Sequence, residues 1–329
     1  MPFSIVRGDI ARVEADVVVN AANERLAPGS GVCGAIYAAA GYDDMLAACR
    51  ELGGCPTGEA VVTPGFALPA CWCVHTVGPV WGGGASGEER ALRSCYRSVF
   101  REVVRLGATS VAYPLISAGV YGYPAEGALA VAREETRAFL EAHDDVDVML
   151  VVFDDDVIWR GSELAREVAG LVDGDDGVGL EPDALVLEEA ALAPSSEVRA
   201  HRSRVPTSLD ERLATLDPTF SETVLALVDG RGMTDAEVYH RANLSRQLFS
   251  KLRGNPGYRP AKATAVALCM GLGLDLDEAE DLLARAGYAL SSSSASDVVV
   301  RWFLERGIHD VLRLNEVLFA YGLPLVGSV

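Results

Sequence analysis

Short apolar segments that alternate with longer amphipathic ones in residues 1–170 constrain the fold of this chain most strongly. Strand-like runs lie at residues 3–6, 16–20, 60–63, 72–77, 110–113 and 146–153, and helical patterns lie at 32–40, 43–52, 88–106, 124–141 and 162–172. Strands connected by helices form parallel or mixed sheets that are covered on both faces. Residues 1–170 are therefore predicted to form an α/β domain with three α/β/α layers and a mixed, largely parallel sheet.

The pattern changes after residue 170, as expected for a chain of 329 residues, which is longer than one core usually spans. Residues 171–205 are rich in Asp, Glu, Gly, Ser and Pro, and we expect an acidic linker there. Residues 206–329 show helical spacing throughout and predict an all-α domain of five or six short helices.

Charge and cysteine content exclude several kinds of function. A net charge of −19 disfavours bulk electrostatic binding to nucleic acid or to anionic membranes. The start of the chain lacks the pattern of a signal peptide, no run of about 18 apolar residues occurs, and the seven cysteines are odd in number, so we expect a cytoplasmic protein with free thiols. Cys71, Cys73 and His75 alternate along one predicted strand, about 6–7 Å apart per step, which is too far for one ion. The sequence predicts neither a metal nor a cofactor.

Two glycine-bearing loops each follow a predicted strand and enter a helix. Loop 1 spans residues 20–36 (NAANERLAPGSGVCGAI), and loop 2 spans residues 114–124 (PLISAGVYGYP). Such turns expose backbone N–H groups at the carboxyl edge of a sheet, where open α/β folds bind phosphates. Either loop alone could be a simple tight turn.

Seven motifs in order resemble the macrodomain family, of the MacroD-like and viral types. They are GDI, ADVVVNAAN, GSGVCGAIYAAAG, GCPTGEAVVTPGFALPA, HTVGPVW, PLISAGVYGYP and VVFDDDVIW, and they cover about the first half of the chain. The resemblance implies an ADP-ribose site. Asp9 and the amide of Ile10 would contact adenine, on which Phe153 would stack, with Asp154 at the same end. The diphosphate would contact the amides of Val32, Ser117, Ala118, Gly119, Val120 and Tyr121.

For the remaining contacts, the resemblance places Asn23 at the hydroxyls of the distal ribose and Tyr121 against that ribose, near Gly119. Each of these residues also has a purely structural alternative. Asp9 would cap a turn and Phe153 would belong to the core. Asn23 would be a turn residue and Tyr121 would pack inside. Asn20, at the end of a strand, is expected to be structural.

One position that bears on catalysis differs from the family pattern. MacroD-type hydrolases have an Asp ten residues after the loop-1 asparagine, where this chain has Cys33. A thiol is a poor substitute for a carboxylate, so we interpret Cys33 as a small residue that lines the ligand site and not as a base or nucleophile. Viral members lacking the Asp still include hydrolases. The implied mechanism is substrate-assisted, with Asn23, Gly119 and Tyr121 as the catalytic set and ADP-ribosyl esters of Asp or Glu, or O-acetyl-ADP-ribose, as substrates. A non-catalytic ADP-ribose reader is the alternative.

The C-terminal domain carries a second resemblance. The stretch MTDAEVYHRANLSRQLFSKLRG resembles repressor-like helix-turn-helix proteins of the lambda type, over about residues 215–290. Arg246 and Gln247 would face base edges, and Lys251 and Arg253 would reach phosphates. Because residues 206–329 hold 12 basic and 16 acidic residues, binding to a protein partner or docking within the chain is the competing hypothesis to DNA binding.

Overall fold

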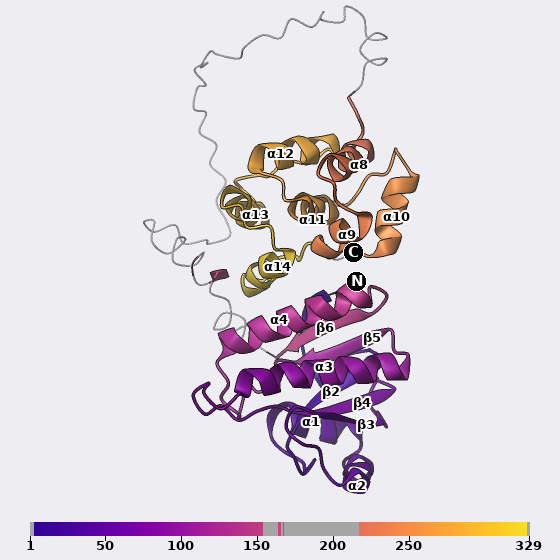
Figure 1. Ribbon diagram of the computed structural model, residues 1–329, viewed down its shortest axis with the longest axis vertical. Coiled ribbons are helices and arrows are strands. Elements are labelled where there is room, and N and C mark those ends of the chain that lie inside the picture. Colours follow the sequence, from indigo (N-terminus) through magenta and orange to yellow (C-terminus); the bar gives the residue numbers. More distant parts are fainter. Residues whose placement is uncertain (1–2, 154–163, 166, 168–216, 328–329) are drawn as a thin grey trace, which may run out of the picture.

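The computed structural model describes residues 3–153, 164–165, 167 and 217–327. These form an α/β half (residues 3–153) and a helical half (residues 217–327), shown below and above in Figure 1. Asp154, the predicted linker at 171–205 and most of the helix predicted at 162–172 lie outside the described residues.

A six-stranded sheet is the centre of the α/β half. Its strands are β1 (Phe3–Arg7), β2 (Val17–Ala22), β3 (Ala60–Pro64), β4 (Trp72–Val77), β5 (Ser110–Pro114) and β6 (Asp147–Val152). They lie in the order β1-β6-β5-β2-β4-β3, and every neighbouring pair is parallel except β3 with β4. The prediction of a mixed, largely parallel sheet is confirmed.

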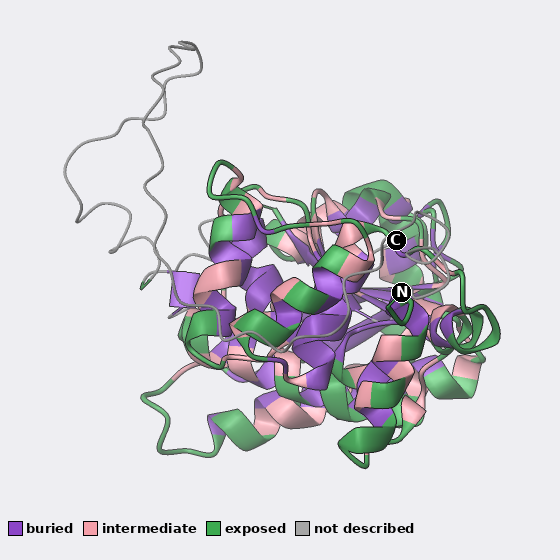
Figure 2. Cartoon of the chain, turned by 90° about the horizontal axis from the view of Figure 1, so that it is seen from above, coloured by how far each residue is buried: buried purple, intermediate pink, exposed green. Residues whose placement is uncertain are grey.

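Helices cover both faces of this sheet. On one face lie α1 (Gly31–Ala40) and α2 (Tyr42–Leu52), and on the other lie α3 (Glu88–Leu106) and α4 (Ala125–Ala142). Successive residues of β2 alternate between the two cores: Val18 packs towards α1 and α2, whereas Val17 and Val19 pack towards α3 and α4. Both faces are buried, which explains the unbroken apolar run Val17–Val19 at the start of the strand. Figure 2 shows the buried residues gathered in the sheet and on the inner faces of the helices.

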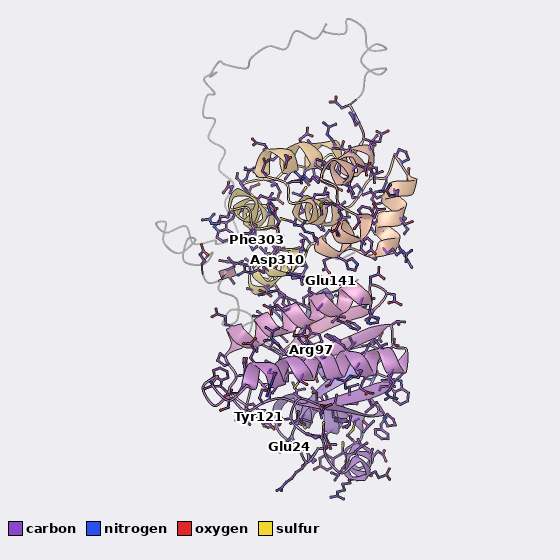
Figure 3. All side chains as sticks on the ribbon, viewed as in Figure 1. Glu24, Arg97, Tyr121, Glu141, Phe303 and Asp310 are labelled. Atoms are coloured by element: carbon purple, nitrogen blue, oxygen red, sulfur yellow. The ribbon has the colours of Figure 1, made fainter. Side chains whose placement is uncertain are left out.

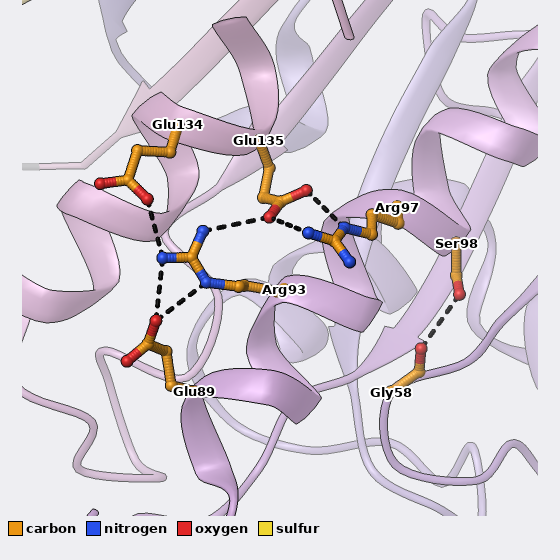
Figure 4. A network of polar contacts seen from close by, with 7 residues as sticks. All are labelled: Gly58, Glu89, Arg93, Arg97, Ser98, Glu134 and Glu135. Carbon is orange, nitrogen blue, oxygen red and sulfur yellow. Dashed lines mark hydrogen bonds and ion pairs between the residues drawn. The ribbon is translucent and has the colours of Figure 1, made fainter. Parts of the chain in front are cut away.

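An ion-pair network joins α3 to α4 (Figure 4). The Glu135 side chain is 7% exposed and contacts both Arg93 (3.1 Å) and Arg97 (2.7 Å). Arg93 also reaches Glu134 and Glu89 at 2.7 and 2.8 Å. The nearly buried carboxylate is thus paired with two guanidinium groups, as a buried charge requires.

The helical half contains seven helices among the described residues. They are α8 (Phe220–Gly230), α9 (Asp235–Arg241), α10 (Arg246–Gly254), α11 (Lys262–Leu272), α12 (Leu276–Arg285), α13 (Ala295–Glu305) and α14 (Val311–Ala320). The prediction of an all-α region is confirmed, but its count of five or six helices was too low. Gly273, at φ +67°, ends α11, and Asp275 caps α12 only two residues later, so these two helices are joined by a very short turn. No helix in the described ranges is both long and apolar enough to span a bilayer.

The helical half packs on the β1 edge of the sheet and on α4. The Asn243 side chain pairs with the backbone of Phe3 as a neighbouring strand would. Its Oδ1 accepts from the Phe3 amide at 3.1 Å, and its Nδ2 donates to the Phe3 carbonyl at 2.8 Å. Arg133 of α4 donates to both oxygens of the buried Glu316 of α14, at 2.8 and 3.1 Å. Further contacts join Arg137 to Asp310, Tyr239 to Asp144, and Arg7 to the ring of Phe319. The edge strand is therefore covered by the chain's own helices.

Candidate functional site

Loop 1 and loop 2 meet at one edge of the sheet because the strands that precede them, β2 and β5, are parallel neighbours. A cavity of about 730 Å³ opens beside them. It is lined by residues 23–25, Thr57, residues 77–80, Gly82, residues 86–88, Ala91 and Tyr121. Glu24 and Tyr121, labelled in Figure 3, lie at the side of the α/β half that faces away from the helical half.

Loop 2 is a turn that leaves the amides of residues 117–121 without a protein acceptor among the described residues. Ser117 adopts a left-handed φ of +64°, and the turn is closed by bonds from the Gly122 amide to the Gly119 carbonyl (2.9 Å) and from the Tyr123 amide to the Ser117 carbonyl (3.0 Å). Within the part of the chain that the structure describes, the amides of residues 117–121 donate to no other protein group. Successive unpaired amides at the end of a strand form a site for an anion.

Asn23 orders the turn of loop 1 through both polar atoms of its side chain. Its Oδ1 accepts from the amides of Arg25 (3.2 Å) and Ala27 (3.1 Å), and its Nδ2 donates to the Ala27 carbonyl at 2.7 Å. The turn-residue alternative thus describes part of what Asn23 does. Since an amide nitrogen carries two hydrogens, one remains for a ligand in the cavity that Asn23 lines.

The start of α1 lies directly after this turn and is uncapped. Its N-cap residue, Ser30, makes no side-chain hydrogen bond to the helix. The first amides of α1, including that of Val32, are therefore open to an anion. Gly34 allows the loop to lie this close, because a Cβ there would be 2.6 Å from the Gly29 carbonyl oxygen.

The residues expected to bind adenine follow the neighbouring strands β1 and β6. The Phe153 side chain is 81% exposed, which excludes the core alternative for it. Asp9 accepts from the Ala11 amide at 3.0 Å and lies 3.6 Å from Arg12, so it does cap the short helix that Ile10 begins. A carboxylate has further acceptor sites, and capping leaves room for a ligand donor. The structure brings Asp9, Ile10 and Phe153 to one edge of the sheet.

Tyr121 and Cys33 are both protonated at neutral pH. Tyr121 lines the cavity, and burial raises the pKa of its phenol. Its carbonyl accepts from the Trp81 amide at 2.8 Å. Cys33 is 5% exposed, and burial raises the pKa of its thiol. Its Sγ lies 3.8 Å from both the Asn20 Nδ2 and the Ala27 carbonyl. A buried thiol that is held in this way agrees with the interpretation of Cys33 as a small residue of the ligand site and not as a nucleophile.

A buried series of hydrogen bonds lies behind loop 1, and the sequence did not predict it. Asn20 Nδ2 lies 3.0 Å from His75 Nδ1, and His75 Nε2 lies 2.9 Å from Thr63 Oγ1. Because Asn20 donates to Nδ1, the His75 proton lies on Nε2 and is donated to Thr63. Burial lowers the pKa of His75 to about 4. Asn20 is thus structural, as expected.

The three residues considered for a metal do not all lie on β4. Cys71 precedes β4 and is exposed, whereas Cys73 and His75 are buried within it. The expectation that all three alternate along one strand is wrong for Cys71, because the strand begins at Trp72. Among the described residues, no group of three ligands for a metal comes together.

The structure adds Glu24, Thr57 and Glu88 to the cavity, and sequence reasoning missed all three. The available signal was a glycine-rich stretch, GGGASG at residues 82–87, that ends at the carboxylate of Glu88. Such a stretch needs side-chain acceptors for its amides, and a neighbouring Glu is a natural source.

The four residues predicted to bind DNA lie on α10. Arg246, Gln247, Lys251 and Arg253 are all exposed, and Ser245 caps the helix by accepting from the Leu248 amide at 3.2 Å. Arg253 forms an ion pair with Asp235 of α9. One exposed helix face thus carries all four side chains.

Comparison with known proteins places the α/β half among macro domains. The model of the family "Macro domain" matches residues 19–132. A macro domain-containing protein of Chlorobaculum tepidum is 47% identical over 148 residues, which are 45% of this chain and 84% of that protein. An O-acetyl-ADP-ribose deacetylase of Escherichia coli strain K12 is 46% identical over 142 residues, 42% of this chain and 80% of that protein.

Two solved structures are also similar. An Oceanobacillus iheyensis macrodomain with ADP is 37% identical, with a TM-score of 0.47, and the match covers 52% of this chain and 93% of that chain. A Trypanosoma brucei macrodomain in complex with ADP-ribose is 39% identical, with a TM-score of 0.44, covering 47% of this chain and 65% of that one.

Proposed function

The chain belongs to the macro domain family, and from this we propose that its α/β half binds ADP-ribose and hydrolyses ADP-ribosyl esters. The observation that carries the proposal is the run of unpaired amides at residues 117–121 beside the uncapped start of α1. A diphosphate is the anion whose two charged groups suit two such turns at one edge of a sheet. The name of the Escherichia coli relative, a deacetylase of O-acetyl-ADP-ribose, supports the hydrolytic part.

Each end of the nucleotide has a candidate partner. The exposed ring of Phe153 offers a surface for adenine, and Asp9 keeps acceptor sites for the adenine amino group. At the other end, Asn23 and Tyr121 line the cavity where the distal ribose would lie. The protonated Tyr121 phenol acts as a donor or as a flat contact, and not as a base.

Hydrolysis at this site needs little from protein side chains. Water adds to the acyl carbonyl, the bond between that carbon and the ribose oxygen breaks, and the products are ADP-ribose and a carboxylic acid. Since Cys33 stays a thiol, the group that orients and deprotonates the water is a phosphate oxygen of the ligand itself. Asn23, Gly119 and Tyr121 hold the distal ribose in the attacking geometry, a contribution through positioning.

Two assays on one wild-type sample test the proposal. Calorimetry with free ADP-ribose measures binding, and release of ADP-ribose from O-acetyl-ADP-ribose and from a peptide ADP-ribosylated on Glu measures turnover. We expect both activities, with turnover lost in Asn23→Ala. Because Asn23 also orders loop 1, a melting curve must show that the variant is folded. Binding without turnover in the wild type would make the protein a reader, and absence of binding at millimolar ADP-ribose would end the proposal.

An ADP-ribose-responsive DNA-binding regulator is the second candidate function, favoured by the exposed α10 face that carries Arg246, Gln247, Lys251 and Arg253. The proposal takes α9 and α10, which a short turn joins, as the helix pair of a repressor-like domain. The expected result is duplex DNA binding that weakens with salt and is reduced in Arg246→Ala. No DNA affinity at low salt would remove this candidate and leave a helical half that serves contacts within the chain or with a protein.

A further inference from the structure

A second cavity lies in the groove between α3 and α4. Its volume is about 460 Å³, and its lining consists of residues 97, 100, 101 and 104 on α3 and residues 135, 138, 139 and 143 at α4. On both helices these positions follow one another at the spacing of a single helix face, so each helix contributes one continuous edge along about two turns. None of the residues that line the cavity beside loops 1 and 2 is among them. This α3–α4 groove is therefore separate from the proposed nucleotide site.

The floor of the α3–α4 groove is aromatic. The rings of Phe100 and Phe139 stack with 4.3 Å between their centroids, and the His143 ring lies 4.8 Å from that of Phe139. Both phenylalanines are nearly buried, whereas Val104, on the α3 side, is 46% exposed. Ala138, on the α4 side, is also exposed. The groove thus keeps apolar surface in contact with water, and covering that surface with another apolar surface is favourable.

The rim of the groove carries positive charge. The side chains of Arg97 and Arg101, one turn apart on α3, are 65% and 66% exposed. Glu135, the carboxylate among the lining residues, is 7% exposed and is bound by Arg93 as well as by Arg97 (Figure 4). Arg101 lies 3.9 Å from the exposed Glu59, and because water weakens such a contact, its guanidinium is available to another carboxylate. This positive rim contrasts with the net charge of −19 of the whole chain.

We propose that the α3–α4 groove is a docking site for an acidic amphipathic helix of a partner protein. A helix that lies in a groove between two others presents its apolar face to the groove, and here Val104 and Ala138 receive that face. Carboxylates at the edge of the docked helix accept from Arg101 and from the Arg97 donors that Glu135 leaves open. Charge complementarity and the apolar floor together select this partner, because nucleic-acid phosphates would match the arginines but leave the apolar surface uncovered. The inference does not depend on ADP-ribose binding.

Binding of a fluorescent peptide to the full chain tests the proposal. The probe is a capped helical peptide of about 15 residues, with leucines on one face and glutamates beside them. We expect saturable binding whose Kd rises about tenfold in Arg101→Glu but less than about twofold in Arg105→Glu, the same change at an exposed arginine of α3 outside the groove. Val104→Asp should likewise weaken binding about tenfold, while Val298→Asp, at a similarly exposed valine of the helical half, should leave it unchanged. All four side chains are exposed, so the variants should fold, and melting curves verify that they do.

Each of four other outcomes would overturn the docking site. Absence of saturable binding, or equal losses in Arg101→Glu and Arg105→Glu, would show that the groove is not the point of contact. Equal affinity for a peptide of the same composition, with its leucines spread around the helix, would show that charge alone is recognised. Displacement of the probe by ADP-ribose would place it on the open amides of loop 2. Tighter binding of a single-stranded oligonucleotide, with the same dependence on Arg101, would make the groove a nucleic-acid site.

Discussion

The two halves of the molecule treat the ends of their helices in opposite ways. In the helical half, side chains cap six of the seven described helices, three of them in reciprocal capping boxes: Thr219 with Glu222, Thr234 with Glu237, and Asp275 with Glu278. In the α/β half, no side chain caps any of α1, α2, α3 or α4. Side chains in the helical half satisfy amides at most of its helix starts, whereas the α/β half leaves amides open in loop 2 and at the start of α1, where a ligand can use them.

The difference also shows what specifies each half. Caps and turns within a few residues of each helix define the helical half locally. The helices of the α/β half are defined by long-range packing on a sheet whose strands come from distant parts of the sequence. Open amides at a binding site forgo the local stabilisation that a cap would give, and the packed sheet offsets that loss.

The largest expected effect tests whether the halves fold as one unit. Glu316 is 3% exposed and its charge is compensated by Arg133 of the other half. Glu316→Ala leaves the partly buried guanidinium of Arg133 without this partner, and we expect a loss of about 3 kcal/mol in the free energy of unfolding, measured with urea. Glu305→Ala, at an exposed position on α13, should cost less than about 0.5 kcal/mol. A loss of that small size in Glu316→Ala would show that the halves are stable independently.

The second prediction concerns a polar chain found in the α/β half. Burial lowers the pKa of His75 from 6.5 to about 4, so below pH 6.5 the unfolded chain binds a proton that the folded chain does not. Stability from this group is present above pH 6.5 and is lost as the pH falls towards 4, by about 3 kcal/mol in all. Urea unfolding across this pH range gives the free energy of unfolding of the wild type and of His75→Gln at each pH. The difference between the two slopes against pH is the contribution of His75. Identical slopes in both proteins would refute it.

The third prediction sharpens the contrast between an open site and a closed core. Phe153→Ala removes the proposed adenine platform, and calorimetry should show an affinity for ADP-ribose that is about 1–3 kcal/mol weaker. Since the ring is 81% exposed, the free energy of unfolding should change by less than about 0.5 kcal/mol. Val298→Ala, at an exposed site in the helical half, should alter neither quantity. Unchanged affinity in Phe153→Ala would place adenine elsewhere.

The smallest effect addresses the caps directly. Thr234 accepts from the Glu237 amide, and Thr234→Ala should lower the free energy of unfolding by about 1 kcal/mol. Ser30, at the same position of α1, makes no cap bond, and Ser30→Ala should cost no more than a few tenths of a kcal/mol. Equal losses from the two substitutions in thermal unfolding would contradict the contrast drawn between the halves.

Much of this architecture was predictable because the signals are local. The apolar runs predicted all six strands, and the observed bounds differ by at most two residues, as for β2, which runs from Val17 to Ala22. The start of α9 at Asp235 has a local signal of the same kind, since Thr234 and Glu237, three residues apart, form a capping box. The order of strands in the sheet had no such local signal.

What the sequence did not predict depends on residues far apart in the chain. Glu88 accepts from amides of its own loop and so orders one wall of the cavity. That loop lies beside loop 2 because the Trp81 amide donates to the Tyr121 carbonyl. The pairing of Asn243 with Phe3 spans 240 positions and has no pattern at either end. The predicted ligand contacts were brought to one edge of the sheet, but their roles in binding stay predictions until a ligand is measured.

A titration of the isotope-labelled full chain with ADP-ribose, followed by amide NMR, observes the proposed diphosphate contacts directly. We expect the amides of residues 117–121 and of Val32 to shift as the site saturates, while those at the capped N-termini of α8, α9 and α12 keep their positions. Saturation that leaves the loop 2 amides unchanged, or no binding at millimolar nucleotide, would contradict it.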